Sequence, residues 1–325
     1  MPGSETVELK NGVRNFAITG VAGYVAPRHL AAIRETGHRL VAALDPHDSV
    51  GVLDSFFFDT TFFTEFERFD RHLEKLRRKG ESDRVHYVSI CAPNYLHDAH
   101  IRLALRLGAN ALCEKPLVVN PWNLDALQEL EAETGSRVFT VHQLRFHPSL
   151  RALKERIETE DPSSVHEVEL KYITPRGRWY PHSWKGSVEK SGGLLLNIGI
   201  HFFDLLLWIF GPARTSRVHI LEPSRAAGHL ELARAKVDWF LSLERCDLPD
   251  PNDLRPYRSL RLDGDEIEFS EGFTNLHKMV YLAMLEGRGC GIDDVRPSIE
   301  LVHRIRHSTP DSRVEDLATL AKSDL

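Results

Sequence analysis

Hydrophobic and polar positions follow one rhythm over roughly the first 140 residues of the chain. Short apolar runs of strand length alternate with helical stretches, beginning with a strand at 14–20 and a helix at 26–37. Further strands are expected at 38–45, 85–93, 110–116 and 137–143, and further helices at 65–80, 95–108 and 123–135. Strands and helices that alternate at this spacing predict a doubly wound parallel sheet of the α/β class.

After about residue 148 the pattern changes to strands in which apolar and polar residues alternate. The segments 166–174 and 236–244 have this alternation, and 259–269 is two strands joined at Asp263–Gly264, a typical hairpin turn. Helices follow at about 275–286 and 295–307. This order predicts an α+β domain with an open, mostly antiparallel sheet and helices on one side.

The two patterns divide a chain of 325 residues, which is long enough for two domains with sizeable cores. We expect a polar N-terminal tail over 1–13, a first domain over 14–145 and a second domain over 146–325. The boundary is placed where the strand–helix alternation stops.

One long apolar stretch, 192–211, carries three polar side chains. On a helix, Asn197, His201 and Asp204 lie at positions i, i+4 and i+7, within roughly 60° of one another. A buried polar group needs a hydrogen-bonding partner. The pattern therefore leaves two interpretations open: a satisfied polar network in the core, or a functional stripe.

Charge and composition narrow the function classes. A net charge of −6 gives no basic surface for nucleic acid, and hydrophobic and charged contents of 42% and 27% are ordinary for a soluble protein. No apolar run is expected to span a membrane, because the stretch 192–211 is interrupted by its polar stripe. The N-terminal segment lacks the apolar core of a signal peptide. We expect a cytoplasmic protein without nucleic-acid or membrane partners.

The cysteines and histidines predict neither a disulfide nor a metal site. Cys91, Cys113, Cys246 and Cys290 lack the C-x-x-C spacing, and the first two end apolar strands, which favours buried free thiols. No pair of histidines has ligand spacing together with an acidic or cysteine partner, so no metal is expected.

A glycine-containing turn joins the first strand to the first helix. Gly20, Gly23 and Ala26 have the spacing GxxGxxA, one residue longer in its first gap than the common dinucleotide-binding pattern GxGxxG/A. Glycines admit a pyrophosphate to the backbone, and the helix N-terminus supplies unpaired N–H groups. Asp45 ends the second strand, where an acid holds a ribose diol and repels a 2′-phosphate. The first domain is therefore predicted to be a Rossmann domain that binds NAD rather than NADP; the alternative is a tight turn beside a surface aspartate.

Two strand ends carry further polar residues at the edge where such sheets bind ligands. In "CAPNYLH" (91–97) and "CEKP" (113–116), a proline stops the strand pairing. Lys115 is then expected to face the cofactor crevice, where desolvation and the cationic nicotinamide lower the pKa of its ammonium and let it act as an acid or a base. The alternative is a surface lysine in a turn.

The motifs along the chain resemble those of one known family. "GVAGYVAPRH", Asp45, "EKP" and the late "GG…N…H..D" helix are similar to the Gfo/Idh/MocA family of nucleotide-dependent sugar oxidoreductases, from about residue 14 to 308. The resemblance implies that Lys115 lies in the active site and that the histidine of the family's helix corresponds to His201. It also implies a cis peptide bond between Lys115 and Pro116.

Longer stretches narrow the resemblance further. "LVAALDPHDSVGVLDSFF" and "VSICAPNYLHDAHIRLALRLGA", among others, are similar to the bacterial UDP-N-acetylglucosaminuronate 3-dehydrogenases of that family. The resemblance implies oxidation of C3 of the sugar by NAD, in the biosynthesis of diacetamido uronic acids of surface polysaccharides such as O-antigen. It also implies a homotetramer and regeneration of NAD by 2-oxoglutarate. Two alternatives stay open: another sugar or inositol dehydrogenase of the same family, and a non-catalytic NAD-binding sensor.

One position departs from the family pattern. Asn197 stands where many members have an aspartate, four residues before the histidine. Because an asparagine cannot take a proton, the chemistry falls on Lys115 and His201, and the residues do not decide which of the two is the base. Asp204, one turn on, either holds the tautomer of the imidazole or completes a buried network.

A substrate with a diphosphate and a carboxylate needs cations around it. The loop 174–193 has basic residues among aromatic ones, and 143–148 joins the two domains, although a basic surface loop is the alternative. The expected NAD contacts are Gly20, Ala22, Gly23, Tyr24, Val25, Asp45, Pro93, Asn94, His97, Glu114, Lys115 and Gln143. The expected substrate contacts are Lys115, Arg145, Arg178, Trp179, Lys185, Asn197 and His201.

Overall fold

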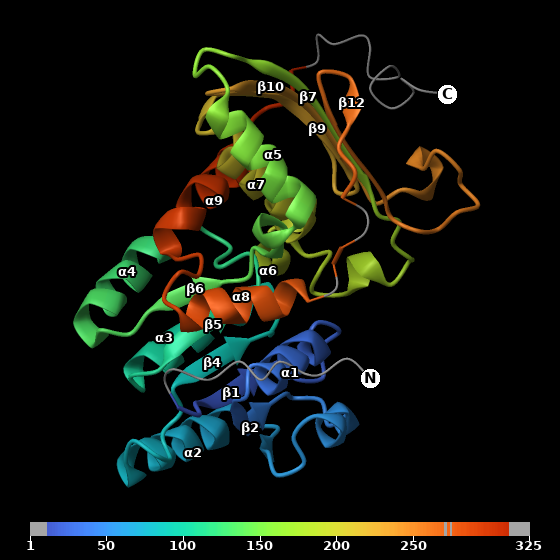
Figure 1. The fold of residues 1–325 in the computed structure, drawn as a ribbon. Coiled ribbons are helices and arrows are strands. Elements are labelled where there is room, and N and C mark those ends of the chain that lie inside the picture. Colours follow the sequence, from blue (N-terminus) through green and yellow to red (C-terminus); the bar gives the residue numbers. More distant parts are fainter. Residues whose placement is uncertain (1–11, 270–271, 274, 312–325) are drawn as a thin grey trace, which may run out of the picture. The chain divides into compact units, whose positions relative to one another are not determined.

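The computed structural model describes residues 12–269, 272–273 and 275–311 (Figure 1), so the expected tail over 1–13 lies outside the described residues apart from its last two. By its contacts the chain divides into two compact units, each made of several segments. The first unit is Met1–Leu117, Trp122–Gln143 and Asn275–Ile292, and the second is Val118–Pro121, Leu144–Thr274 and Asp293–Leu325. The segment Asn275–Ile292, which the sequence pattern places in the second domain, therefore belongs to the first unit.

The first unit is built on a six-stranded sheet in which every pairing is parallel. The strand order β3-β2-β1-β4-β5-β6 means that the chain starts in the middle of the sheet and winds outward in both directions. The strands are β1 (Asn15–Thr19), β2 (Arg39–Leu44), β3 (Thr61–Phe63), β4 (Tyr87–Ile90), β5 (Asn110–Cys113) and β6 (Val138–Thr140). The predicted doubly wound sheet is confirmed, and the three-residue strand β3 is an addition to the predicted strands.

Helices accompany this sheet. They are α1 (Ala26–Glu35), α2 (Phe66–Lys79), α3 (His97–Arg106), α4 (Trp122–Thr134) and α8 (Leu276–Leu285), with single turns η1 (Gly51–Ser55) and η2 (Asn94–Leu96). All five positions of β1 are buried, as expected for a central parallel strand covered on both faces. Helix α8 packs against α1. Cys91 and Cys113 are buried free thiols, as predicted.

The second unit has a six-stranded sheet of order β12-β11-β7-β10-β9-β8. Its strands are β7 (His166–Ile173), β8 (Ala213–Leu221), β9 (Arg225–Leu232), β10 (Ala235–Ser242), β11 (Tyr257–Leu262) and β12 (Asp265–Glu266). Only β7 and β10 pair in parallel, so the prediction of a mostly antiparallel sheet is confirmed. The predicted hairpin joins β11 to β12, and both Asp263 and Gly264 have the positive φ values that its turn needs.

The helices of the second unit include the apolar stretch that carries the polar stripe. They are α5 (Pro148–Thr159), α6 (Val188–Ser191), α7 (Ile200–Phe210) and α9 (Ile292–Arg306), with short turns η3 (Gln143–Phe146), η4 (Tyr180–His182) and η6 (Arg245–Asp247). A π-helical turn, η5 (Leu195–Gly199), precedes α7. Helix α7 packs against α5, and Phe203 on it contacts the ring of Trp239 on β10.

The expectation that no apolar run could span a membrane is wrong for the length and composition of this stretch. Val188–Phe210 is one helical run long and apolar enough to do so, despite its polar stripe. Within the protein, 72% of its apolar window is buried, which is typical of a core helix. Phe203 against the sheet illustrates that role.

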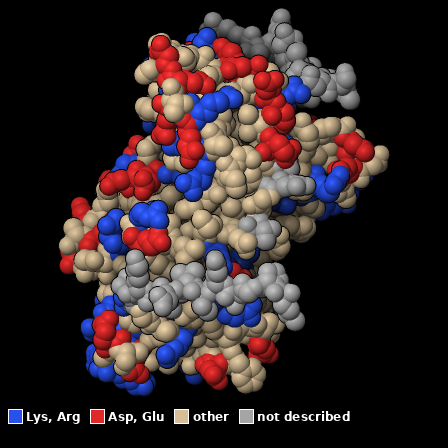
Figure 2. All heavy atoms as spheres, in the orientation of Figure 1, with Lys and Arg blue, Asp and Glu red and all other residues tan. Residues whose placement is uncertain are grey.

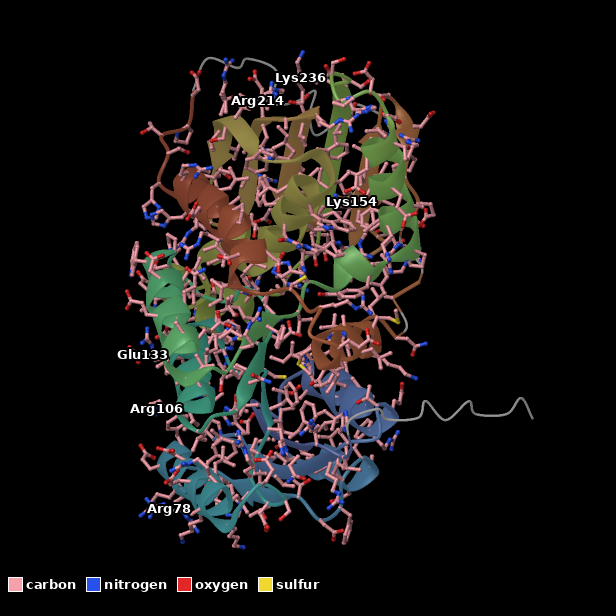
Figure 3. All side chains as sticks on the ribbon, turned by 60° about the vertical axis from the view of Figure 1, so that its left-hand side comes forward. Arg78, Arg106, Glu133, Lys154, Arg214 and Lys236 are labelled. Atoms are coloured by element: carbon pink, nitrogen blue, oxygen red, sulfur yellow. The ribbon has the colours of Figure 1, made fainter. Side chains whose placement is uncertain are left out.

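Most charged side chains lie on the outside of the two units, and Asp45, Glu114 and Asp204 are buried exceptions. On the face shown in Figure 2, basic and acidic residues are interspersed. Of the side chains labelled in Figure 3, Arg78, Arg106 and Glu133 lie at the outside of the first unit, and Arg214 and Lys236 at the outside of the second. Lys154 on α5 is half-buried beside Trp208.

The burial of His100 on α3 predicts a loss of stability in mild acid. Its Nδ1 lies 2.9 Å from Thr19 Oγ1, and burial, helped by nearby His97, lowers its pKa from 6.5 to about 4. Because the folded pKa is the lower one, the unfolded chain binds more protons, and stability falls as the pH decreases from about 6.5 toward 4. Urea titrations at about pH 7.5 and pH 5 should show that His100→Asn loses about 2 kcal/mol less than the wild type over this interval. Equal losses in the two proteins would contradict the assignment.

Candidate active site

The turn after β1 brings the backbone close to the end of β4. Gly20 has a φ of +78°, and a Cβ on it would lie 2.5 Å from the carbonyl carbon of Cys91 and 2.6 Å from the backbone nitrogen of Ala92. The N–H of Gly23 donates to the Gly20 carbonyl at 3.0 Å, and that of Ala26 donates to Gly23 at 3.1 Å. Glycine at position 20 is therefore required both by its conformation and by the close approach of the next strand.

Asp45 lies at the end of β2 and fastens this turn. Its side chain is buried, its Oδ2 accepts a hydrogen bond from the Ala22 N–H at 2.9 Å, and its Oδ1 accepts one from the His47 N–H at 2.9 Å. A carboxylate has about four lone-pair positions, so capacity for the two hydroxyls of a ribose remains. Tyr24, in the same turn, is 84% exposed, and the Arg28 guanidinium lies over its ring.

The segments after β4 and β5 are held together by one buried histidine. His97 Nδ1 is 2.7 Å from the Pro116 carbonyl oxygen, and its Nε2 is 2.9 Å from that of Ala92. The peptide bond between Lys115 and Pro116 is cis, as the resemblance implies. Burial lowers the pKa of His97, although both carbonyls act in the opposite direction. The geometry therefore gives His97 a scaffolding role at this edge, whereas its contact with NAD stays a prediction, as does that of neighbouring Asn94.

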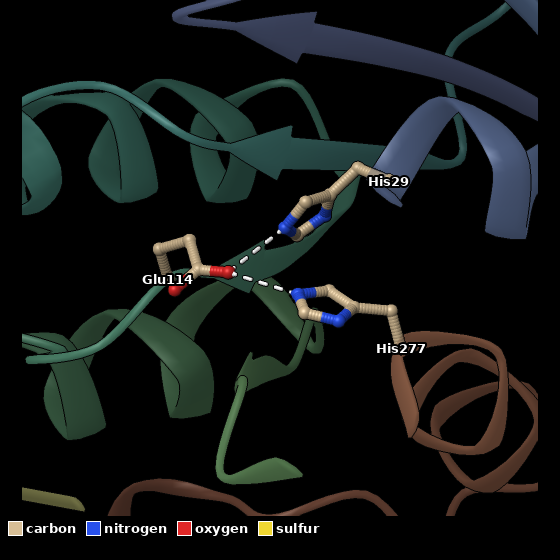
Figure 4. A group of neighbouring side chains, drawn as sticks. All are labelled: His29, Glu114 and His277. Carbon is tan, nitrogen blue, oxygen red and sulfur yellow. Dashed lines mark hydrogen bonds and ion pairs between the residues drawn. The ribbon is translucent and has the colours of Figure 1, made fainter. Parts of the chain in front are cut away.

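Glu114, which directly follows β5, lies between two histidine side chains from other elements (Figure 4). Its Oε1 is 3.0 Å from His29 Nε2 on α1 and 3.4 Å from His277 Nε2 on α8, and His29 Nδ1 is 2.9 Å from the Tyr281 hydroxyl. Burial opposes ionisation of Glu114, but the hydrogen bonds with His277 and His29 outweigh it and hold the pKa of the carboxyl well below its usual range. Burial lowers the pKa of His29, against the opposing effect of Glu114.

His29, Glu114 and His277 are also a group of donors that could hold a metal ion. They come from three separate parts of the sequence, so no local spacing could have revealed them. The prediction that the protein needs no metal stays a prediction.

Two further expected contacts follow the neighbouring strands β5 and β6. Lys115 comes two residues after β5, and Gln143 three residues after β6. The carboxyl ends of parallel strands meet at one edge of a sheet, which is the edge that carries Gly20 and Asp45. The Gln143 Oε1 is buried without a hydrogen-bond partner among the described residues, so it is available to a bound ligand.

In the second unit, the polar stripe is joined to the segment before α5. The Arg145 Nε and terminal nitrogen donate to the two carboxylate oxygens of Asp204 at 2.8 and 2.6 Å, and the same terminal nitrogen donates to the Asp294 carbonyl. Asp204 is 2% exposed. This favours the network interpretation for Asp204. Arg145, expected to contact substrate, uses two of its three guanidinium nitrogens in this pair.

The other two residues of the stripe lie on different kinds of helix. Asn197 is in the π-helical turn η5, and its Nδ2 donates to the Tyr180 hydroxyl at 3.0 Å. His201 follows in the first turn of α7 and is partly exposed. Because π-helical turns are frequent at functional sites, the local geometry is consistent with the functional interpretation of these two residues.

The loop between β7 and α6 gathers a cation and aromatic rings. The Lys185 ammonium lies 5.6 Å from the ring centre of Trp179 and 5.7 Å from that of Trp184. Burial, with a contribution from Arg176, lowers the pKa of Lys185. A partly desolvated cation beside exposed aromatic surface suits an anionic ligand. Arg178, expected beside them, is exposed in the same loop.

Family comparisons agree with both units. The model described as "Oxidoreductase family, NAD-binding Rossmann fold" matches residues 14–142, and the model described as "Oxidoreductase family, C-terminal alpha/beta domain" matches residues 154–239. The chain belongs to the Gfo/Idh/MocA family. It is therefore an oxidoreductase, and its first unit is an NAD-binding Rossmann domain.

Solved structures give a closer likeness within the Gfo/Idh/MocA family. The WlbA (WbpB) dehydrogenase of Thermus thermophilus, in complex with NAD and alpha-ketoglutarate, is 52% identical, with a TM-score of 0.89 and coverage of 94% of this chain and 98% of that one. A second structure of it, in complex with NAD and UDP-GlcNAcA, is 51% identical with the same TM-score and coverage.

Curated relatives match over shorter stretches. The 2,7-anhydro-N-acetylneuraminate hydratase of Mediterraneibacter gnavus is 27% identical over 60% of this chain and 49% of its own length. This chain spans between 18% and 49% of the length of the first four curated relatives that it matches.

The residues at the sheet edge fit the NAD that the Gfo/Idh/MocA fold implies. At Gly20 the absence of a side chain leaves space that a Cβ would fill, and the Asp45 carboxylate has unused lone pairs. Gln143 has a buried oxygen without a partner among the described residues.

His29, His277 and Tyr281 were not among the residues predicted from the sequence, because they come together only through the packing of α1, β5 and α8. No pattern in the sequence indicates this packing, so the three residues could be identified only from the structure.

Gly20→Ala should destabilise the protein and weaken NAD binding. The added methyl group meets backbone atoms in a positive-φ conformation, so we expect a loss of about 3 kcal/mol in unfolding free energy and NAD affinity at least about tenfold weaker. Gly135→Ala is the matched control, since Gly135 has a φ of +71° but open space around it. It should cost about 1 kcal/mol and leave NAD affinity unchanged. Chemical denaturation and calorimetric titration with NAD measure both, and equal effects would refute the close-approach argument.

Asp204→Asn should unfold the second unit more easily by leaving Arg145 as a buried, poorly compensated cation. The expected loss is about 3 kcal/mol in denaturant titrations. The control is Asp253→Asn, which removes an exposed partner of Arg255 and should leave the denaturation midpoint unchanged. If both variants unfold like the wild type, the Arg145–Asp204 pair does not anchor α7.

Proposed function

We propose that the protein oxidises the C3 hydroxyl of UDP-N-acetyl-D-glucosaminuronic acid to the 3-keto sugar with NAD, and that 2-oxoglutarate reoxidises the NADH. The observation that carries this proposal is the 51–52% identity, over 94% of the chain, to a dehydrogenase crystallised with NAD and UDP-GlcNAcA and with NAD and alpha-ketoglutarate. The presence of Lys115 after β5 and of His201 on α7, the positions that the family resemblance assigns to the active site, supports it.

NAD, when bound, accepts the hydride from C3 of the sugar at C4 of its nicotinamide. As the hydride leaves, the C3 hydroxyl must lose its proton, and either Lys115 or His201 takes it while the other holds the oxygen. Asn197 contributes hydrogen bonds only. A positioned base accounts for roughly 10²- to 10⁴-fold in rate, and alignment of the two reacting carbons accounts for much of the rest.

The loop with Lys185 supplies the charge that the substrate needs. A UDP-uronate carries a diphosphate and a carboxylate, and Lys185, Arg178 and the Trp179 ring offer two cations and a stacking surface. 2-Oxoglutarate is also an anion. In the second half-reaction, the lysine or histidine that took the proton of the sugar would return it to the keto oxygen of 2-oxoglutarate, while bound NADH would supply the hydride, which gives 2-hydroxyglutarate and NAD.

We place this reaction in the cytoplasm, in the biosynthesis of diacetamido uronic acids of a bacterial surface polysaccharide such as O-antigen, and expect the enzyme to work as a homotetramer. The resemblance to bacterial UDP-N-acetylglucosaminuronate 3-dehydrogenases supports these three statements. Gel filtration with light scattering tests the last of them.

Incubation of the purified protein with the UDP-uronate tests the substrate. We expect a product about 2 Da lighter by mass spectrometry, formed together with absorbance at 340 nm or, when 2-oxoglutarate is present, with 2-hydroxyglutarate. UDP-N-acetylglucosamine and myo-inositol are the controls, and we expect no product from either. Oxidation of a control in place of the UDP-uronate would overturn the proposed substrate.

Lys115→Met and His201→Asn should each lower kcat by about 10²-fold or more while NAD still binds. Lys75→Met, a change on the exposed face of α2, should leave kcat unchanged. The pH dependence of the remaining activity identifies the base. In the variant that lacks the base, the fall in kcat at low pH should disappear. Wild-type kcat in both variants would remove both residues from the mechanism.

A further inference from the structure

A chain of hydrogen bonds runs through the interior of the first unit and ends on Glu114. Ser89 Oγ on β4 is 2.6 Å from the Tyr281 hydroxyl, which is 2.9 Å from His29 Nδ1. The other nitrogen of this imidazole faces Glu114 Oε1, and so does Nε2 of His277 (Figure 4). The side chains of Ser89, His29 and Tyr281 are fully buried, and those of Glu114 and His277 are nearly so. The first unit thus contains a polar network that the proposed reaction does not use directly.

Counting protons fixes the direction of each hydrogen bond. An ionised carboxylate can only accept, so both histidines donate to Glu114 through Nε2–H. His29 then has a lone pair on Nδ1 and accepts from the Tyr281 hydroxyl, whose oxygen accepts from Ser89. Every contact receives one proton, and His29, which accepts at Nδ1, is neutral. The network is therefore complete around one buried negative charge.

The same carboxylate is attached to the segment that carries Lys115. Its Oε2 accepts from the backbone N–H of Lys115 at 3.3 Å, while the Glu114 N–H donates to Ile90 in the strand ladder. On the far side of Lys115, the Pro116 carbonyl contacts His97. The backbone on both sides of Lys115 is thus fixed by buried side chains, although Lys115 lies just beyond the last strand pair.

We propose that Glu114 is a positioning residue for Lys115. We also propose that α8, through His277 and Tyr281, helps to hold Glu114 in place. The proposal rests on the proposed function in one respect, namely that Lys115 acts on the substrate hydroxyl. The two residues on α8 are one helical turn apart, so one face of the helix holds Glu114 directly and also sets the tautomer of His29. Glu114 holds Lys115 through its backbone.

The same donors can be arranged around a metal ion, and the two arrangements differ in their protons. A metal would take the lone pair of His29 Nε2, so the proton would move to Nδ1 and be donated to Tyr281. The hydrogen-bonded network requires the opposite tautomer. The position of one proton on His29 therefore distinguishes the hydrogen-bonded network from a metal site.

The first test does not depend on turnover. Long-range ¹H–¹⁵N spectra of the histidine-labelled protein, assigned with His29→Gln and His277→Gln, should show a proton on Nε2 of both rings and none on Nδ1 of His29. Metal analysis of the purified protein should show less than about a tenth of an equivalent of zinc or another transition metal. An Nδ1–H tautomer at His29, or one equivalent of bound metal, would overturn the network.

The second test asks whether the network positions Lys115. Tyr281→Phe keeps the ring and removes the hydroxyl, and Glu114→Gln removes the charge. Tyr281→Phe should lower kcat about tenfold and Glu114→Gln about a hundredfold, with KM for both substrates within about twofold. Tyr87→Phe and His38→Gln, which alter buried or half-buried rings outside the network, should leave kcat unchanged. Wild-type kcat in Glu114→Gln would refute the proposal.

Hydrogen exchange separates this inference from the proposed function. In Tyr281→Phe, the Lys115 amide should exchange at least about tenfold faster than in the wild type, while the amides of β1 keep their protection. If the UDP-uronate is not a substrate but this change appears, the proposed function fails and the positioning network stands. Unchanged exchange at Lys115 would overturn the network as a positioning device whatever the substrate is.

Discussion

The structure of the first unit depends on the burial of one negative charge. Glu114 directly follows β5, the strand beside the edge strand β6, and an ionised carboxylate in that buried position is tolerated only if donors surround it. Two imidazoles and a backbone N–H supply them. This requirement explains why α1 and α8, which are far apart in the sequence, must pack against the same edge of the sheet.

The second unit also contains a buried carboxylate, which is compensated by a different type of partner. Asp204 is buried on an apolar helix, and it is compensated by the bidentate guanidinium of Arg145 rather than by histidines. The ion pair ties α7 to the segment before α5. Each unit therefore places an ionised carboxylate close in sequence to a residue proposed for the chemistry, Lys115 in one and His201 in the other, and uses the partners of that carboxylate to fix the local backbone.

Local patterns predicted the parts of the fold that local sequence determines. The parallel sheet, the turn at Gly20, the hairpin at Asp263–Gly264 and the mostly antiparallel second sheet are all confirmed, because the patterns that predict their strands and turns are local in the sequence. The strands β8 and β9 were missed, and for β8 the reason is that much of its surface is polar and exposed, so the apolar alternation is weak. The group around Glu114 could not be predicted, since His29 and His277 meet it only through tertiary packing.

The membership of Asn275–Ile292 in the first unit has a consequence for biosynthesis. A chain leaves the ribosome from its N-terminus at about 5–20 residues per second, and most domains fold as they emerge. Here the sheet and α1 emerge early, whereas the histidine and tyrosine of α8 emerge only after nearly the whole second unit has been made. Until then, Glu114 lacks two of its buried neighbours. Maturation of the nucleotide-binding unit is thus tied to completion of the polypeptide, and a nascent chain released early would not contain a finished dehydrogenase core.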